Sequence, residues 1–530
     1  MNIRKCLPVL ALATAAIAFA TVSPSRAAQT PKSGGTFVFA IGNDPESLNP
    51  AITTGVAALA VDCKMFNGLL WVDRQNKEHP ELATTWTVAK DGMAYTFRLR
   101  HDVKWHDGQP FTAADVQFTF WNVLRLYHPR SRVVFENVAD VTAPDPYTVV
   151  LKMKKPYAPL LDDMTCQDAP ILPKHLYAGT DILQNPHNSN DPVGTGPWQF
   201  VSWTRGDRVE MKRNPGYFRK GLPYFDSVIA KIVPDPVSRI QSLQTGEIDY
   251  VQSFFLPKTQ VAPLKADKRI QLKYDTDVPG NYLMFFNVAR KPLDDERVRQ
   301  ALLRALDRKQ ILDQAFSGIG YVGKSAIHQK LPFYDPAVDL TKLYSYNPTE
   351  AGKELDALGL PSKGGMRFTL HLLYDVHQAG FTAIAQIIRD NYRKIGVDVV
   401  LEPYETQVFD DFMYTKRDFD IGLQAYTTGG DPAIGIARAY ITTPPGKPFT
   451  NPTNFSDPNV DKLFEEAAST VDVAVRKKDY DALQVLLAKA LPLVPLIDRT
   501  EVDAAQANLR DLWQSRQPYD EWDGVWRASP

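Results

Sequence analysis

Residues 368–401 read FTLHLLYDVHQAGFTAIAQIIRDNYRKIGVDVVL, and this stretch decides the class of fold. The apolar run at 368–373 predicts a strand, and 381–394 carries apolar residues at helical spacing. Gly396 then ends the helix, and 397–401 predicts a second strand. A strand, a helix and a strand in this order form a βαβ unit, whose strands lie parallel in one sheet. The stretch therefore predicts an α/β lobe.

The chain around this unit continues the alternation of helices and strands. A helix capped by Asp294 has apolar residues at helical spacing between Val298 and Leu306. Parallel strands end at one edge of their sheet, and ligands of α/β proteins bind there. The loops after the strands at 368–373 and 421–425 are therefore the first places to look for a site. The other expected elements are helices over 309–316, 348–359, 409–414, 460–468 and 473–489.

Short strands dominate the first half of the chain. They are expected over 36–41, 95–100 and 148–153. Thr112 and Asp115 have the spacing of a capping box and predict the start of a helix that runs to about Leu126. The C-terminal residues are rich in Trp and Asp, and we expect them to pack back onto the first part of the chain.

Length and composition exclude several classes of protein. The 530 residues suffice for several domain-sized units, and 60 basic against 61 acidic residues give no charge bias toward nucleic acid. Three Cys exclude a disulfide scaffold and a Cys-rich zinc array. Nine His without ligand spacing predict no metal site, so no cofactor is expected.

No catalytic motif is found in the sequence. Gly-x-Ser-x-Gly, His-Glu-x-x-His and Cys-x-x-Cys do not occur. Residues 318–325, GIGYVGKS, match the letters of a phosphate-binding loop, which needs a strand before it and a helix after it. Here a helix precedes the loop and 326–332 is not helical in pattern, so we predict a connecting loop. The adjacent carboxylates Asp162 and Asp163 are expected on a solvated face.

Residues 1–27 have the pattern of a secretory signal peptide. Arg4 and Lys5 precede a short apolar core, and Ser25 to Ala27 offer small residues for cleavage near Ala27. The core is shorter than the roughly 20 residues that span a bilayer. Removing this segment takes away three basic residues and no acidic one, which moves the formal net charge from −1 to −4. Cys63 and Cys166 remain, and an oxidising compartment permits a disulfide between them without requiring it.

A series of short motifs runs along nearly all of the chain after residue 27. They are YTFRLR (95–100), VKWHDG (103–108), TAADV (112–116), GTGPW (194–198), NPGYF (214–218), GEID (246–249), PLDDERVRQA (292–301) with DR (307–308), and YNP (346–348). Each motif is weak alone, but their number and order are specific. Together they resemble the family 5 extracellular solute-binding proteins of ABC transporters, the dipeptide- and oligopeptide-binding type.

The resemblance implies a fold of the α/β class, the type II periplasmic binding protein fold with two lobes and an extra domain inserted in the first. The implied boundaries are 28–75, 194–280 and 496–530 for lobe I, 76–193 for the inserted domain, and 281–495 for lobe II. Residues 194–197 are expected to form a backbone crossover between the lobes. His106 is expected to be a turn residue with satisfied hydrogen bonds rather than a ligand or a base.

The resemblance also implies a function in transport. The protein is expected to be a periplasmic monomer that closes over a peptide or similar small polar solute and delivers it to an ABC permease and ATPase complex. Such capture needs no covalent chemistry, so we expect no enzyme activity and no nucleic-acid partner. A secreted hydrolase of peptides or glycans is the alternative, and a sensor or chaperone with the same fold is a further one.

Five residues are the candidates for contacts with the solute: Tyr374, His377, Tyr426, Thr428 and Asp431. The first two follow the strand at 368–373, and the other three follow the strand at 421–425. For Asp431 there are two expectations, a partner for a cationic group or the cap of a helix.

The resemblance has two departures that bear on the solute. In peptide-binding relatives the loop at 426–432 resembles Asp-x-x-Asp/Glu-Pro, and its first acidic residue holds the peptide's ammonium group. Thr428 stands in that place here, and a hydroxyl does not supply the charge-assisted bond that a buried ammonium requires. Thr406 stands where such relatives often have a pocket Trp. The solute is therefore left open among a peptide, a modified peptide, an oligosaccharide, an opine and another small polar molecule.

Overall fold

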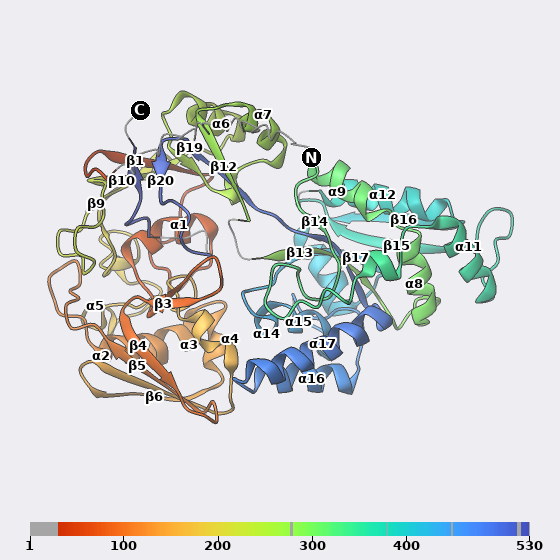
Figure 1. Ribbon diagram of the computed structural model, residues 1–530, viewed down its shortest axis with the longest axis horizontal. Helices are drawn as coiled ribbons and strands as arrows, with labels where there is room; N and C mark the ends of the chain where they lie inside the picture. Colours follow the sequence, from red (N-terminus) through yellow and green to blue (C-terminus); the bar gives the residue numbers. More distant parts are fainter. Residues whose placement is uncertain (1–29, 276–278, 379, 447–448, 517–520, 529–530) are drawn as a thin grey trace, which may run out of the picture.

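Two lobes make up the molecule (Figure 1). This computed structural model describes residues 30–275, 279–378, 380–446, 449–516 and 521–528. The predicted signal peptide lies outside the described residues. In the part that is described, no helix is long and apolar enough to cross a membrane.

The first lobe is built on a seven-stranded sheet with the order β12-β19-β11-β1-β10-β9-β8. The central strand β1 lies parallel to β10 and β11, while β19 runs antiparallel to β11 and β12. The strands are β1 (Thr36–Ile41), β8 (Trp198–Thr204), β9 (Arg208–Arg213), β10 (Ser227–Ile232), β11 (Tyr250–Val251), β12 (Ile270–Tyr274) and β19 (Val502–Gln506). The helices beside them are α1 (Val56–Met65), α6 (Pro236–Thr245) and α7 (Val261–Ala266). Two small antiparallel pairs add β2 (Leu70–Val72) with β3 (Glu78–Pro80), and β20 (Leu509–Arg510) with β21 (Trp526–Arg527).

A four-stranded antiparallel sheet, which we call the third sheet, lies below the first lobe (Figure 1). Its strands are β4 (Ala83–Val88), β5 (Ala94–Leu99), β6 (Val138–Asp145) and β7 (Thr148–Met153), with helices α2 (Ala113–Phe118), α3 (Arg125–Tyr127), α4 (Ser131–Phe135) and α5 (Lys174–Tyr177). The Thr112–Asp115 capping box is present. The expected helix is interrupted, because the chain passes through a π-helical segment over Thr119–Leu124.

The second lobe contains a six-stranded mixed sheet with the order β14-β18-β13-β17-β15-β16. The predicted βαβ unit is confirmed, since β15 and β16 pair in parallel along their whole length and α12 connects them. The strands are β13 (Gly280–Phe286), β14 (Tyr321–Val322), β15 (Phe368–Asp375), β16 (Val397–Tyr404), β17 (Ile421–Thr427) and β18 (Leu493–Asp498). The helices are α8 (Glu296–Arg304), α9 (Arg308–Phe316), α10 (Leu340–Leu343), α11 (Pro348–Ala357), α12 (Phe381–Arg393), α13 (Thr406–Asp410), α14 (Pro432–Gly435), α15 (Ala437–Tyr440), α16 (Pro458–Ala468) and α17 (Val473–Ala490).

The lobes are connected by the chain between β12 and β13 and by the chain between β18 and β19. The described residues of these two connections, Asp275 and Pro279 in the first and Arg499 to Glu501 in the second, are what we call the hinge. The expectation that residues 194–197 cross between the lobes is wrong. They join the third sheet to β8 and lie against the end of α1, where a Cβ on Gly194 would meet the Met65 carbonyl oxygen at 1.9 Å. The glycines are therefore required by close backbone packing inside the first lobe.

The hydrophobic cores follow this division. One continuous core spans the first lobe and the third sheet, which explains why these layers form one body. The Cys63–Cys166 disulfide lies within it and joins α1 to the loop after β7. The C-terminal residues return to this core as expected, with the Trp522 ring edge-on to Phe37 at 5.0 Å between centroids. Two further cores occupy the second lobe, and a fourth lies between α6, α7 and the first sheet.

Two local expectations for the second lobe are corrected. Asp295 rather than Asp294 caps α8, because its carboxylate accepts the Arg297 backbone N–H at 2.9 Å. The Pro-rich segment that ends at Pro495 continues as strand β18, in which Leu496 is the extra residue of a β-bulge opposite Tyr282 and Leu283 of β13. Because β18 extends to Asp498, the second sheet passes the predicted boundary at 495, and the domain boundaries stay a prediction.

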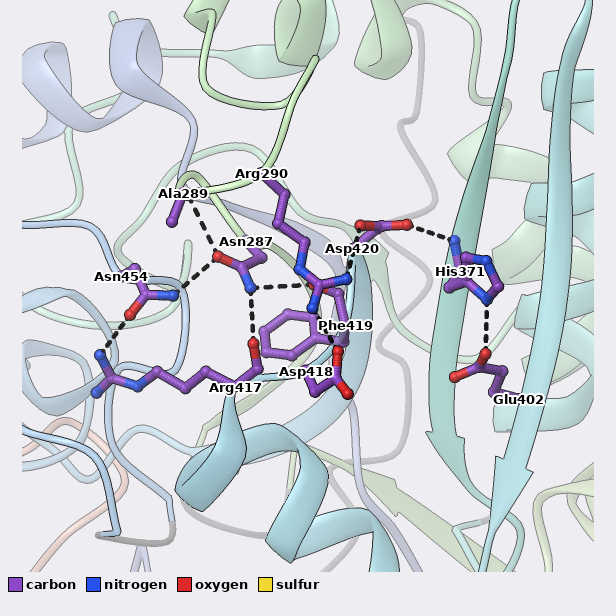
Figure 2. A network of polar contacts seen from close by, with 10 residues as sticks. All are labelled: Asn287, Ala289, Arg290, His371, Glu402, Arg417, Asp418, Phe419, Asp420 and Asn454. Atoms are coloured by element: carbon purple, nitrogen blue, oxygen red, sulfur yellow. Dashed lines mark hydrogen bonds and ion pairs between the residues drawn. The ribbon is translucent and has the colours of Figure 1, made fainter.

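A polar network secures the end of the second sheet away from the hinge (Figure 2). The Asn287 side chain donates to the carbonyls of Arg417 and Phe419 at 2.9 and 3.0 Å and accepts from Asn454 at 2.9 Å. On the neighbouring strand, Asp420 accepts the His371 backbone N–H at 2.8 Å. These bonds hold the chain before β17 against the end of β13, so this end of the lobe has a structural role.

Candidate functional site

A cavity of about 300 Å³ lies against the hinge between the two lobes. We call it the hinge cavity. Both connections contribute to it, as do the loop between β2 and β3, a loop of the second lobe and the C-terminal segment. Its lining residues are Arg74, Gln75, Asn76, Asp275, Pro279, His328, Lys330, Arg499, Glu501 and Arg516.

The hinge separates this cavity from a second one of about 430 Å³. Side chains of an extended segment point alternately to opposite faces. Arg499 and Glu501 line the hinge cavity, whereas Thr500 lines the second cavity together with residues of α7 and the loop after α9. The two cavities therefore lie on opposite sides of the connection 499–501, and the hinge cavity is lined by residues of both lobes.

Positive charge predominates in the hinge cavity. Four of its lining residues are Arg or Lys and two are acidic. Both carboxylates already have partners on the protein: Glu501 accepts Arg499 at 2.6 Å, and Asp275 lies 3.7 Å from the Lys330 ammonium. Asp275 also accepts the Thr500 hydroxyl at 3.2 Å. Arg499 and Lys330 are thus paired with the two carboxylates of the lining, and Arg516 is paired with Asp162.

Arg516 is the most buried of these cations. Its Nη2 lies 2.8 Å from Asp162 Oδ1, and its Nη1 donates to Asn76 Oδ1 at 2.9 Å. The side chain is 6% exposed, and its Nε has no acceptor among the residues that the structure describes. The Nη atoms of Arg516 therefore join the third sheet to the β2–β3 loop, and its Nε is enclosed by the protein.

The lobes touch on the far side of the hinge cavity. Gly430, in the loop after β17, lies against the Arg516–Asp162 pair so closely that a Cβ there would meet Arg516 Nη1 at 1.9 Å. Farther out, the Lys155 ammonium lies 3.4 Å from the Glu465 carboxylate on α16. These contacts join the third sheet and the C-terminal segment to the second lobe. The structure therefore has its lobes in contact around the cavity.

The expectation of a solvated face for Asp162 and Asp163 is wrong. Asp162 pairs with Arg516 at the lobe contact, and Asp163 is 5% exposed. Burial raises the pKa of Asp163 well above its usual value, and nearby Asp168 and Asp162 act in the same direction. Both carboxylates belong to the interface between the lobes.

Thr428 and Tyr426 come after β17 close to the hinge. The Thr428 hydroxyl donates to the Pro279 carbonyl at 2.6 Å, and the residue is 2% exposed. The Tyr426 hydroxyl bonds to the Thr450 carbonyl at 2.9 Å, and its ring lies under the Arg438 guanidinium at 4.7 Å. Thr428 therefore ties the second lobe to the first hinge connection, and Tyr426 packs within its own lobe.

Asp431 caps a helix and forms an internal ion pair. Its carboxylate accepts the Ala433 N–H at 2.9 Å at the start of α14. Arg476 Nη2 lies 2.7 Å from both of its oxygens. Burial raises the pKa of Asp431, whereas Arg476 lowers it. The cationic partner of this carboxylate is thus a residue of the protein.

Tyr374 and His377 lie at the end of β15, the strand that pairs in parallel with β17. Tyr374 is 4% exposed and belongs to the core of the second lobe. His377 is exposed and bonds to the Glu405 carboxylate at 2.5 Å, which raises the pKa of the imidazole. Tyr426, Thr428 and Asp431 lie at and just after the end of β17, and Tyr374 and His377 lie at and just after the end of β15. Which of the five contact the solute stays a prediction.

Two motifs noted in the sequence have structural roles. His106 Nδ1 accepts the Gly194 N–H at 3.2 Å, and Nε2 lies 3.0 Å from the Gly196 carbonyl. Burial lowers the pKa of this imidazole to about 4. The loop at 318–325 leads from α9 into the short strand β14, with no helix after it. The predictions of a satisfied turn histidine and of a connecting loop are confirmed.

A comparison with protein families decides the identity of the chain. The model of the bacterial extracellular solute-binding proteins, family 5, matches residues 77–447. The chain belongs to this family. It is a solute-binding protein and not an enzyme, and the alternative of a secreted hydrolase is not supported.

The relatives of this solute-binding protein agree in sequence and fold. The glutathione-binding protein GsiB of Salmonella typhimurium is 28% identical over 523 residues, which cover 96% of each chain. AgaA of A. tumefaciens R10, solved with agropinic acid, is 25% identical with a TM-score of 0.74, covering 94% of this chain and 99% of that one. HbpA2 of Haemophilus parasuis has a TM-score of 0.82 at 24% identity, covering 93% and 100%. The predicted type II periplasmic binding protein fold is confirmed.

Sequence reasoning missed the residues that line the hinge cavity. Arg74, Lys330 and Arg516 are surrounded by unremarkable sequence, and no motif marks them. The available signal was indirect. The chain crosses from one lobe to the other at the hinge connections, and a ligand site is expected beside such crossings.

Proposed function

We propose that this solute-binding protein captures a small polar solute in the hinge cavity by closure of its lobes and presents it to an ABC permease. The observation that carries the proposal is the cavity itself, which is lined by residues of both lobes and both hinge connections. A solute held there touches both lobes at once. It therefore binds the closed state better than the open one, which is the condition for driving closure.

Lobe closure also creates the surface that a permease reads. The contacts at Gly430 and at Lys155–Glu465 join surfaces that separate when the lobes open. We propose that the closed protein is a monomer in the periplasm, exported by the segment at 1–27, and that its partner is the permease and ATPase complex of an importer.

The solute we propose is a peptide or a molecule of similar size and polarity. The relatives support this range, since one binds glutathione, a tripeptide, and another was solved with agropinic acid. A cavity of about 300 Å³ is at the small end of the range for ligand pockets. Among the predicted contacts we retain Thr428, Tyr426, Asp431, Tyr374 and His377, with the first at the hinge itself.

A screen by thermal shift tests the proposal. Peptides, amino-acid conjugates, opines and oligosaccharides are added to the mature protein, and a solute that binds only the folded state raises the melting temperature by mass action. Solution scattering with the best solute is expected to show a smaller radius of gyration than without it. A solute that raises the melting temperature but leaves the radius unchanged would contradict capture by closure, and so would turnover of the solute by the pure protein.

A further inference from the structure

We infer that the second cavity is a gap that widens when the lobes come together over the hinge cavity, and that its walls set the fraction of unliganded protein that is closed. This inference rests on the proposed closure of the lobes and adds a device that controls it. One wall of the second cavity is α7 with the turn before it, in the first lobe, and the other is the loop after α9, in the second lobe.

The first argument is the position of the second cavity relative to the lobe contacts. Figure 1 shows α7 and α9 on one side of the two connections, and α4 and α16 on the other. Lys155 meets Glu465 of α16 on that other side. Bodies that rotate about a common hinge approach on one side of it and separate on the other. A rotation that separates Lys155 from Glu465 therefore drives the walls of the second cavity together.

The second argument is that these walls are not packed against each other. The cavity has a volume of about 430 Å³, against about 300 Å³ for the hinge cavity. Its lining residues Thr259, Ala262 and Lys265 are exposed on one wall, and Ser317 and Gly318 are exposed on the other. A Cβ on Gly318 would meet no atom within 4 Å. The walls thus have room to approach when the lobes open.

The third argument is a contact between the lobes at the inner end of this gap. The Lys258 ammonium of the first lobe lies 5.6 Å from the Phe316 ring centre and 5.9 Å from that of Tyr282, both in the second lobe. Tyr282 is close to the hinge, since its ring lies 5.5 Å from the Arg499 guanidinium. A cation at such a distance from aromatic faces is attracted to them. The lobes therefore touch beside the hinge, and the gap is open farther out.

The width of the gap accordingly limits how far the lobes can open. A protein whose closed state is the one that holds its solute gains affinity when that state is more populated without solute. A larger side chain on either wall occupies the space that opening requires. It therefore favours the closed state from a place that the solute does not touch.

The test enlarges one wall and measures the distance between the lobes without solute. Ala262→Trp and Thr259→Trp each place a bulky ring in the second cavity from an exposed position. Ala266→Trp is the matched control, because Ala266 is exposed on the same helix but is not a lining residue. Each variant is made in the mature protein with spin labels at Lys155→Cys and Glu465→Cys, and distances are measured by double electron–electron resonance.

We expect the unliganded parent protein and Ala266→Trp to give the same long, broad distribution. Ala262→Trp and Thr259→Trp are expected to raise the population at short distance at least threefold. Solution scattering on the same samples is expected to give a smaller radius of gyration for these two variants. Circular dichroism and the melting temperature check that each variant is folded.

Two results would overturn the inference. They are a distribution in Ala262→Trp and Thr259→Trp that equals or exceeds the parent's in length, and an equal shift to short distance in Ala266→Trp. If the two variants stay open while a solute closes the parent, the inference fails and the proposed function stands. If the two variants close but no solute closes the parent, the second cavity has the inferred role and capture by closure fails.

Discussion

At the scale of single residues, close packing explains why glycine and histidine are needed at particular positions. Gly194 and Gly196 lie against the carbonyls at the end of α1, and His106 bonds to the backbone of both. The GTGP and WHDG motifs, which are far apart in sequence, are therefore two halves of one turn structure. The sequence predicted that these motifs are structural, but their mutual contact depends on tertiary packing that no local pattern encodes.

Protonation of His106 is expected to destabilise the protein in acid. Its pKa is about 4 when folded and near 6.5 when unfolded, so this stabilisation is present above pH 6.5 and is lost as the pH falls toward 4. A positive charge on Nδ1 would break the bond from the Gly194 N–H. In His106→Gln, the free energy of unfolding in urea is expected to be lower at pH 7 and to fall less steeply between pH 6.5 and 4.

The comparison with wild type isolates this effect from other titrating groups. Burial raises the pKa of Glu81 to about 7, so that group acts in the opposite sense and loses stabilisation as the pH rises through 7. Glu81 is present in both proteins, and its contribution cancels in the difference. Equal pH slopes for the two proteins would refute the assignment to His106.

Gly430 is expected to be essential for tight solute binding. In Gly430→Ala the new methyl group meets Arg516 Nη1 and Asp162 Oδ2, at 1.9 and 2.4 Å in the present geometry, so these side chains or the lobes must move apart. We expect solute affinity to fall about tenfold, which corresponds to a loss of roughly 1.4 kcal/mol in the free energy of binding and closure. The melting temperature without solute is expected to change little, because the contact is between lobes.

Gly352→Ala on α11 is the matched control. Its Cβ would meet nothing closer than 3.6 Å, so solute affinity should be unchanged. Wild-type affinity in Gly430→Ala would show that the contact at Gly430 is not needed for closure.

At the scale of elements, sequence periodicity was sufficient to predict a helix or strand whose apolar residues are the buried ones. Strand β15, helix α12 and strand β16 have apolar patterns that match their burial, and the sequence predicted all three. Pro495 concealed β18, because a proline in a strand removes a ladder hydrogen bond and is tolerated here beside a bulge. The interruption of the helix after Phe118 was also missed, since its cause is not local.

The Cys63–Cys166 disulfide is expected to stabilise the packing of α1 against the layer that contains the third sheet. It closes a loop of 103 residues, and removing a native disulfide costs about 2–5 kcal/mol. The double variant Cys63→Ser, Cys166→Ser is expected to unfold at lower urea concentration by this amount. Reduction of the wild type with dithiothreitol should give the same loss, and identical unfolding curves for oxidised and reduced protein would contradict the prediction.

At the scale of the whole molecule, the fold was predictable and the site was not. The ordered motifs implied two lobes and an inserted domain, and the sheets have that arrangement. The hinge cavity draws Arg74, Lys330, Arg499 and Arg516 from four distant segments. Their side chains meet only after the lobes have folded and closed, so neither spacing nor strand ends could predict the set. Of the five candidate residues chosen from loops after strands, Thr428 is the one that bonds to the hinge.

The distance between the lobes in solution tests the central claim most directly. Spin labels at Lys155→Cys and Glu465→Cys mark two residues whose charged groups lie 3.4 Å apart here, while the native cysteines are held in their disulfide. Double electron–electron resonance is measured with and without a solute that raises the melting temperature. Capture by closure predicts a long, broad distance distribution without solute and one short distance with it. The same distribution in both samples would contradict the account.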